Sequence, residues 1–276
     1  MKVVAIVFDW AGTMVDFGCM APVAALRAAF AGHGVALSAA QVRRDMGKAK
    51  RDHVRALLAD PEIRQLWATA TRALPDQGDE DHLMAALEPL MATMAKDHAA
   101  LIPGAADLVA LLGRRSVKIG SCTGYSRAMM AGILPLAAAG GYAPEAVVCS
   151  DDTPLGRPSP LMVWRALADL RAWPAHACIK VDDAPVGMEE GVAAGTWSVG
   201  VAASGNGVGL ALADWLNLSV SERDARTAAA AGPLWAAGAD FVIGSVADLP
   251  PVIDEIEARL RRGERPGIAR VSTTAR

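Results

Sequence analysis

The first residues of the chain constrain its fold most. Residues 3–8 form an unbroken apolar run rich in β-branched side chains, and Asp9 follows it directly. Such a run is typical of a β-strand that is buried on both faces of a parallel sheet. Because open α/β sheets bind ligands at the carboxyl ends of their strands, Asp9 is a candidate metal ligand or nucleophile. A lone Asp before a turn at Gly12 is also compatible with a cap or turn role.

The chain changes character along its length. Its 276 residues allow one large domain or two unequal ones. Residues 19–100 carry apolar side chains at helical spacing and include no convincing strand, whereas strand-like and helix-like segments alternate after Pro103 and Gly104. We therefore predict an α/β fold, a doubly wound parallel-sheet (Rossmann-like) core built from 1–18 and 101–276, with an all-helical cap domain inserted at 19–100. The polar tail from residue 263 is expected to fray.

Composition limits the binding partners and the cellular compartment that the chain is expected to have. The formal net charge is −3, which gives no reason to expect nucleic-acid or membrane binding. The four cysteines are far apart in sequence and form no Cys-x-x-Cys pair, which argues against a zinc site and suits a reducing cytoplasm. The apolar run at residues 3–8 is too short for the core of a signal peptide. We therefore expect a cytoplasmic protein.

Polar residues follow several of the predicted strands. Thr123 and Gly124 follow one strand, and Asp182 and Asp183 follow another. In a parallel sheet these positions converge with Asp9 on one edge, where carboxylates repel each other unless a cation lies between them. Oxygen ligands without His or Cys favour Mg²⁺. Thr123 and the Gly124 amide could bind phosphate oxygens, and Arg157 could neutralise the same group.

This order of residues resembles the haloacid dehalogenase superfamily. The resemblance implies that Asp9 is a nucleophile that forms an aspartyl-phosphate, with Mg²⁺ as cofactor. One position departs from the family pattern, because Ala11 stands where phosphatases of the family carry an acid that protonates an alkoxide. Ala11 can offer only its backbone carbonyl to a metal. Either the activity is lost, or the leaving group is not an alkoxide.

A lysine in the predicted cap could supply a different kind of activation. Lys50 and His53 are three residues apart, so they share a face of a helix. A lysine amine can form an imine with a carbonyl, and the neighbouring cations Lys48 and Arg51 favour its neutral form. The alternative is a solvated basic helix surface.

Longer motifs extend the resemblance to the phosphonoacetaldehyde hydrolase family. They lie at residues 9–13, 18–22, 46–57, 123–130 and 156–158. The resemblance implies that Lys50 forms a Schiff base with phosphonoacetaldehyde while His53 shuttles protons. Asp9 would then cleave the carbon–phosphorus bond, giving acetaldehyde and phosphate, as a step in 2-aminoethylphosphonate degradation. It also implies a homodimer formed through the cap domains.

The same resemblance identifies further site residues. Cys19 and Met46 correspond to residues that line the family's pocket, and both are also compatible with a core or interface role. Tyr125 could reach the substrate or simply pack. Of the metal ligands, Asp183 matches the family pattern, but Gly187 stands where relatives often carry a second Asp. Either Asp182 or water then completes a shell that includes Asp9, Ala11 and Asp183.

Two other functions compete with this interpretation. A phosphate-ester phosphatase or mutase of the same superfamily would not need Lys50 and would normally not carry Ala11. A non-catalytic binding protein would not be expected to keep Asp9, Thr123 and Arg157 together with Asp183.

Overall fold

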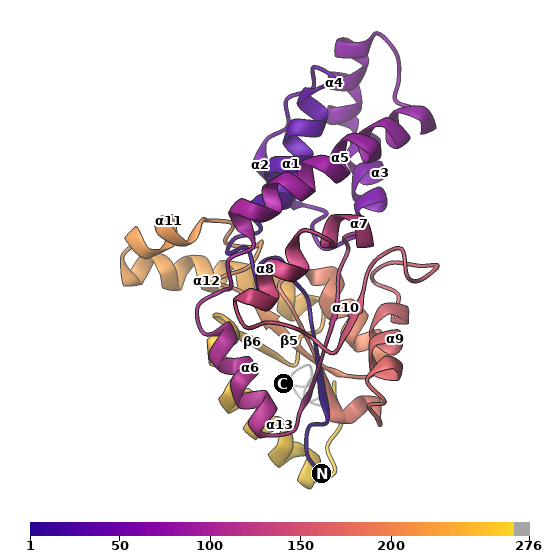
Figure 1. The fold of residues 1–276 in the computed structure, drawn as a ribbon. Coiled ribbons are helices and arrows are strands. Elements are labelled where there is room, and N and C mark those ends of the chain that lie inside the picture. The colour runs from indigo at the N-terminus through magenta and orange to yellow at the C-terminus, as the bar shows by residue number, and fades with distance from the viewer. Residues whose placement is uncertain (268–276) are drawn as a thin grey trace, which may run out of the picture.

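A computed structural model gives the structure of residues 1–267, apart from the side chains at 95 and 96. The last part of the tail that we expect to fray, residues 268–276, lies outside the described residues. Figure 1 shows a sheet flanked by helices, with a second group of helices standing beyond one end of the sheet.

The sheet contains six strands in the order β3-β2-β1-β4-β5-β6, and every pair is parallel. The first strand, β1, therefore lies between strands that follow it by more than 100 residues. The strands are β1 (Ala5–Phe8), β2 (Lys118–Cys122), β3 (Ala146–Val148), β4 (Cys178–Asp182), β5 (Trp197–Val201) and β6 (Phe241–Ile243).

Helices cover both faces of the sheet. On β1, Ile6 and Phe8 point into a core shared with α6 (Ala105–Arg114) and α13 (Leu249–Arg261). Ala5 and Val7 point to the opposite side, where α9 (Leu161–Asp169) packs beside α10 (Pro185–Ala194). The alternation follows from the period of two residues along a strand. It buries β1 on both faces, as the apolar run predicts, and it makes the sheet doubly wound.

The helices inserted between β1 and α6 form the all-helical cap. They are α1 (Met20–Ala31), α2 (Ala39–Arg43), α3 (Lys50–Ala59), α4 (Pro61–Thr71) and α5 (Gln77–His98). Phe30 of α1 and Trp67 of α4 are fully buried, and their rings meet nearly edge to face. The predicted fold class, an α/β parallel sheet with an inserted helical cap, is confirmed.

Two adjacent chain segments connect the cap to the sheet. The amide of Asp16 donates to the carbonyl of Ala100 at 3.2 Å, and the amide of Ile102 donates to Met14 at 2.9 Å. These bonds hold the outgoing and returning segments side by side. The cap is therefore attached along one narrow, paired connection.

Some local predictions were incomplete. The sequence pattern predicts one helix over 127–138, but the structure has two, α7 (Arg127–Met130) and α8 (Ile133–Ala139), because the helix is interrupted before Gly132. The pattern also predicts a helix over 225–237, but α12 (Val220–Ala236) begins earlier, at a capping box made by Ser219 and Glu222, and it does not predict α11 (Leu212–Asn217). Among the described residues, no helix combines the length and apolar character needed to cross a membrane.

Candidate active site

Asp9 lies at the carboxyl end of β1, in the middle of the sheet. Its amide donates to the carbonyl of Val181 at 2.9 Å, so the backbone remains bonded to β4 at this point. Gly12 makes the turn that follows, with φ +79, and a Cβ there would lie 2.5 Å from Asp183 Oδ2. Only glycine fits this turn, which brings the loop after β1 against the loop after β4.

Three buried carboxylates meet at this edge. Oxygen atoms of Asp9, Asp182 and Asp183 all lie within 4.8 Å of one another. Burial and the charge on Asp182 raise the pKa of Asp9 to about 6, and burial with the charges of both neighbours raises the pKa of Asp183 to about 8. A divalent cation among these oxygens would remove the repulsion, and hard carboxylate ligands suit Mg²⁺. The residues present therefore fit a magnesium ion.

Asp182 differs from its two neighbours because cations already surround it. Its Oδ2 lies 2.8 Å from Lys180 Nζ and 3.3 Å from Arg157 Nη2, and both cations lower its pKa against the effect of burial. A Cβ at Gly187 would lie 2.0 Å from Asp182 Cγ. The Asp182 carboxylate thus fills the space next to residue 187, which explains why only a glycine is accommodated there.

Arg157 joins the phosphate side of the site to the carboxylates. Its Nη2 donates to Asp9 Oδ1 at 2.8 Å and to the carbonyl of Cys122 at 2.9 Å, while its Nε donates to Glu190 at 2.9 Å. Its Nη1 donates to the carbonyl of Gly47 in the cap at 3.2 Å. A guanidinium fixed in this way presents a permanent positive charge beside Asp9.

Lys50 enters the site from the cap. It is the first residue of α3, and its amide donates to the carbonyl of Gly124 at 3.0 Å. Its side chain is 2% exposed, and Nζ lies 4.8 Å from the centre of the Tyr125 ring. Burial lowers the pKa of Lys50 to about 8, which increases the fraction of neutral amine near pH 7. The alternative of a solvated basic surface is therefore wrong for Lys50.

His53 lies one turn further along α3 and is fully buried. Burial and the neighbouring Lys50 lower its pKa to about 3, so the ring is neutral. Nε2 lies 2.8 Å from the carbonyl of Val42 and must donate to it, while Nδ1 has no hydrogen-bond partner among the described residues. The ring thus has a free acceptor nitrogen on the element that carries Lys50.

The loop after β2 faces both Lys50 and Asp9. The amide of Thr123 continues the sheet by donating to Val148 at 3.0 Å, and the amide of Tyr125 donates to Thr123 Oγ1 at 3.2 Å. Gly124 is required here, because a Cβ would lie 2.3 Å from the carbonyl oxygen of Lys48. Within the part of the chain that the structure describes, the buried Tyr125 hydroxyl has no hydrogen-bond partner, so a polar ligand group could bind it.

Most of the predicted site residues surround one cavity of about 20 Å³. Its lining comprises Asp9, Ala11, Cys19, Met46, Gly47, Lys50, Thr123, Gly124, Tyr125, Arg157 and Asp183. Cys19 donates its thiol to Asp183 Oδ2 at 3.1 Å, and Met46 is 7% exposed. Asp182 and His53 are not among the lining residues; Asp182 lies against Arg157, and His53 follows Lys50 by three residues on α3. A space of this size holds about one water molecule, so the cap is closed over the site.

Two charged residues behind the site were not predicted. Lys180 on β4 and Glu190 on α10 are fully buried, and Glu190 pairs with Arg157 at 2.9 Å and with Lys180 at 3.3 Å. One feature of the sequence indicates such a buried charge: Lys180 interrupts the otherwise apolar residues 178–181 of a strand that is buried on both faces. The backbone amide of Asn206 donates to Asp183 Oδ2 at 2.6 Å, and no sequence pattern indicates that Asn206 belongs to the site.

Comparison with known proteins gives the family. The model of the family described as "Hydrolase: haloacid dehalogenase-like hydrolase" matches residues 3–195. The chain is 47% identical over 262 residues to the phosphonoacetaldehyde hydrolase of Paraburkholderia phytofirmans, covering 95% of this chain and 98% of that protein. The chain belongs to the phosphonoacetaldehyde hydrolase family. It is therefore an enzyme, a hydrolase of the haloacid dehalogenase superfamily.

Other relatives agree with this assignment. The phosphonoacetaldehyde hydrolase of Hahella chejuensis is 41% identical, with 98% of this chain and 93% of that protein covered. The crystal structure of a phosphonoacetaldehyde hydrolase-like protein from Oleispira antarctica superposes with a TM-score of 0.95 at 38% identity, and 96% of each chain is covered. Phosphonoacetaldehyde hydrolases are thus similar to this chain in both sequence and fold, over nearly its whole length.

Proposed function

We propose that this enzyme hydrolyses the carbon–phosphorus bond of phosphonoacetaldehyde, through a Schiff base on Lys50 and a phosphorylated Asp9. The observation that carries the proposal is the placement of a buried Lys50, with a pKa of about 8, on the same closed cavity as Asp9. An amine serves carbonyl chemistry and a carboxylate serves phosphoryl transfer. A substrate whose carbonyl carbon and phosphorus are joined through one carbon would engage both residues.

The first step joins Lys50 to the aldehyde. The neutral amine attacks the carbonyl carbon, and loss of water gives an imine, whose protonated form withdraws electrons from the neighbouring carbon. His53 is neutral, and its free Nδ1 can accept a proton, through water, during this dehydration. Because His53 does not line the cavity, we assign it proton transfer and not substrate binding.

The second step transfers the phosphoryl group to Asp9. The carboxylate forms a bond to phosphorus as the carbon–phosphorus bond breaks, and the electron pair of that bond moves into the iminium to give an enamine. Arg157, Thr123 and the Gly124 amide would bind the phosphonyl oxygens. Asp9, Asp183 and the Ala11 carbonyl would hold Mg²⁺, and either Asp182 or water would complete its ligands. When bound, Mg²⁺ supplies charge stabilisation to the phosphonyl oxygens.

Hydrolysis then regenerates the enzyme. Proton transfer to the enamine carbon gives the imine of acetaldehyde, and water releases acetaldehyde from Lys50. A second water hydrolyses the aspartyl-phosphate to phosphate. We propose this reaction as a step in the degradation of 2-aminoethylphosphonate, whose amine would first become an aldehyde.

A phosphate-ester phosphatase is the second candidate, since it would share Asp9, Arg157 and the magnesium ligands. The loop after β1 disfavours it, because Ala11 lines the cavity without a group that could protonate an alkoxide. A carbon leaving group stabilised by an iminium needs no acid at this position. Release of phosphate from phosphonoacetaldehyde, compared with release from p-nitrophenyl phosphate, separates the two candidates.

Borohydride trapping tests the proposal directly. With phosphonoacetaldehyde present, borohydride should reduce the imine to a secondary amine, inactivate the enzyme and leave a mass label on the peptide that contains Lys50. Borohydride alone should leave activity unchanged. Lys50→Arg should abolish turnover and labelling, because a guanidinium stays protonated near neutral pH.

Lys48→Arg provides the matched control. Lys48 lies two residues away, is about one-third exposed and pairs with Asp45, so the substitution preserves charge at a solvated position. It should keep activity and labelling within about twofold. An active Lys50→Arg enzyme that yields no label would remove the Schiff base and, with it, the proposed route for carbon–phosphorus cleavage.

The resemblance that supports this function also implies a setting for it. We propose residues 1–18 and 101–276 as a core domain, 19–100 as a cap domain, a cytoplasmic location and a homodimer joined through the caps. Leu66 and Leu74 are large, exposed apolar side chains of the cap and are candidates for that contact. Light scattering of the purified protein would report twice the chain mass, and Leu66→Glu should lower it.

A further inference from the structure

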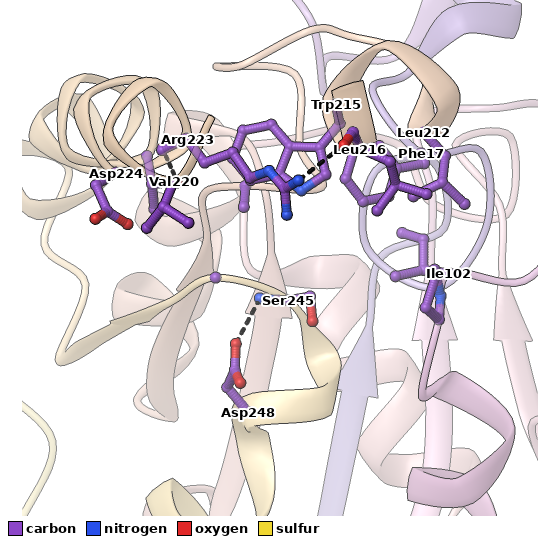
Figure 2. Close-up of a pocket in the computed structure, with 14 residues that line it drawn as sticks. Phe17, Ile102, Leu212, Trp215, Leu216, Val220, Arg223, Asp224, Ser245 and Asp248 are labelled. Carbon is purple, nitrogen blue, oxygen red and sulfur yellow. Dashed lines mark hydrogen bonds between the residues drawn. The ribbon is translucent and has the colours of Figure 1, made fainter. Parts of the chain in front are cut away.

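A large cavity in the described part of the chain is separate from the active site. It has a volume of about 500 Å³ and shares no lining residue with the cavity around Asp9. Phe17 comes from the segment that leads into the cap, and Ile102 and Pro103 come from the segment that returns from it. The remaining walls are α11, α12 and the turn after β6 (Figure 2). The cavity therefore lies against both connections between cap and sheet.

One wall of this cavity suits a flat apolar molecule. The rings of Phe17 and Trp215 lie 6.2 Å apart at 41°, and Leu212 and Leu216 line the cavity beside them. Leu216 is 58% exposed, so an apolar surface also faces solvent at this wall. Mostly apolar cavities of roughly 300–1,000 Å³ with a few polar groups are typical small-molecule sites. Displacing water from these walls would favour binding of an apolar ring.

The polar groups favour a ligand that donates hydrogen bonds. Arg223 stacks over Trp215, and its Nε and Nη2 donate to the carbonyls of Leu218 and Leu216, so these two donors serve its own wall. Asp248 lies across the cavity from this wall, and its Oδ2 accepts a bond from the Ser245 amide at 3.0 Å (Figure 2). Asp224 adds a second carboxylate to the lining. A protonated amine would complement these carboxylates.

The loop that leads into α11 connects this cavity to the active site and to the cap. The backbone carbonyl of Ser204 accepts a hydrogen bond from the amide of Gly18 at 2.8 Å, and the backbone amide of Asn206 donates to Asp183 Oδ2 at 2.6 Å. Arg43 of α2 donates to Asn206 Oδ1 at 3.0 Å and to the carbonyl of Gly18 at 2.7 Å. A molecule packed against Phe17 and Trp215 would contact the structure that fixes the base of the cap.

We propose that this cavity is a second binding site, which takes a small flat aromatic molecule carrying a protonated amine. The ring packs against the Phe17 and Trp215 side chains where they line the cavity, and the amine faces Asp248. Bound ligand touches both cap connections and restrains their movement. The site is independent of the chemistry at Asp9, so it can be tested without turnover.

Calorimetric titration with 1-naphthylmethylamine tests the binding. One molecule should bind per chain with a sub-millimolar dissociation constant, and 1-naphthylacetate, which has the same ring and the opposite charge, should bind at least about tenfold more weakly. Trp215→Ala and Asp248→Asn should each weaken amine binding by at least about tenfold. Trp235→Ala is the control, since Trp235 is half exposed on α12 outside the cavity, and it should bind as the wild type does.

Hydrogen exchange tests the restraint on the cap. The amine should slow exchange at the amides of Asp16, Gly18 and Ile102, which form the bonds at the cap connections, and should have no effect in Trp215→Ala. Absence of saturable binding, or binding that survives Trp215→Ala, would overturn the site. Equal binding of the acetate would overturn the assignment of an amine, and binding without slower exchange would overturn the restraint.

Discussion

At the scale of single residues, the ionisation of Lys50 sets a testable pH dependence. Burial lowers the pKa of Lys50 to about 8, and only the neutral amine attacks an aldehyde. Below pH 8 the neutral fraction, and with it kcat/KM, should fall by about tenfold per pH unit. His53, whose pKa is about 3, should add no step near pH 6.5.

Steady-state rates between pH 5.5 and 9 at saturating Mg²⁺ would show this single acid limb. Lys48→Arg should reproduce the wild-type profile, because Lys48 lies outside the closed cavity. A profile that is flat between pH 6 and 8 would contradict a lysine that must lose its proton before it reacts.

The neighbouring carboxylates Asp182 and Asp183 should respond in opposite ways to loss of charge. Asp182 is paired with Lys180 and Arg157, so Asp182→Asn leaves two buried cations undercompensated and should cost about 3 kcal/mol or more of unfolding free energy. Burial and the charges of Asp9 and Asp182 raise the pKa of Asp183 to about 8, so Asp183→Asn removes a carboxyl group that is costly to ionise and should leave the metal-free protein as stable as the wild type or more so.

Thermal unfolding in chelator and in excess Mg²⁺ distinguishes the two variants. Mg²⁺ should stabilise the wild type by about 2–3 kcal/mol at 100 times its dissociation constant, and should not stabilise Asp183→Asn. If Asp183→Asn lost as much stability in chelator as Asp182→Asn does, the described difference in their surroundings would be wrong.

At the scale of elements, the sequence predicts the strands better than the buried charges behind them. The apolar run before Asp9 and the polar residues after β2 and β4 predict the sheet and one converging edge, because the burial of a strand shows in its own residues and the alternation of strands with helices indicates parallel pairing. The pairing of Lys180 with Glu190 depends on how α10 packs on β4, which no local pattern records. The break at Gly132 was missed because the helical spacing continues across it.

The turn before α3 is an element with a test of its own, because Gly47 brings the cap against the core. Gly47 has φ +94, and a Cβ there would lie 2.7 Å from the Cβ of Ala184. Gly47→Ala should therefore separate the cap from the core and lower kcat/KM by at least about tenfold. Its cost in stability should be only about 1 kcal/mol, the cost of a side chain at positive φ.

Gly34→Ala is the matched control for this turn. Gly34 also lies in a cap loop at φ +76, but a Cβ there would meet only the Cβ of Ala70, at an ordinary 3.5 Å. The two variants should lose similar stability in urea, while Gly34→Ala keeps its activity. Equal losses of activity would mean that the fit between cap and core at Gly47 does not matter for catalysis.

At the scale of the whole molecule, the closed cap must open during each turnover. The cavity around Asp9 holds about 20 Å³, too little for a phosphonate with an aldehyde. Two paired segments connect the cap to the sheet, so movement of the cap about them can expose Lys50 and Asp9 together. A bond between cap and core away from the cavity lining should therefore trap the enzyme in a closed, inactive state.

Cysteines in place of Ala49 in the cap and Gly156 in the core would form such a bond. A Cβ at residue 156 would lie 3.1 Å from the Cβ of Ala49, and a disulfide needs the two atoms only about half an ångström further apart. The double variant Ala49→Cys/Gly156→Cys should be active when reduced and should lose activity by at least about 100-fold when oxidised, because substrate cannot enter. Dithiothreitol should restore it. The native cysteines are buried and free, so each single variant, oxidised in the same way, should stay active. Wild-type turnover by a double variant whose disulfide is verified by mass would mean that substrate reaches Lys50 without movement of the cap.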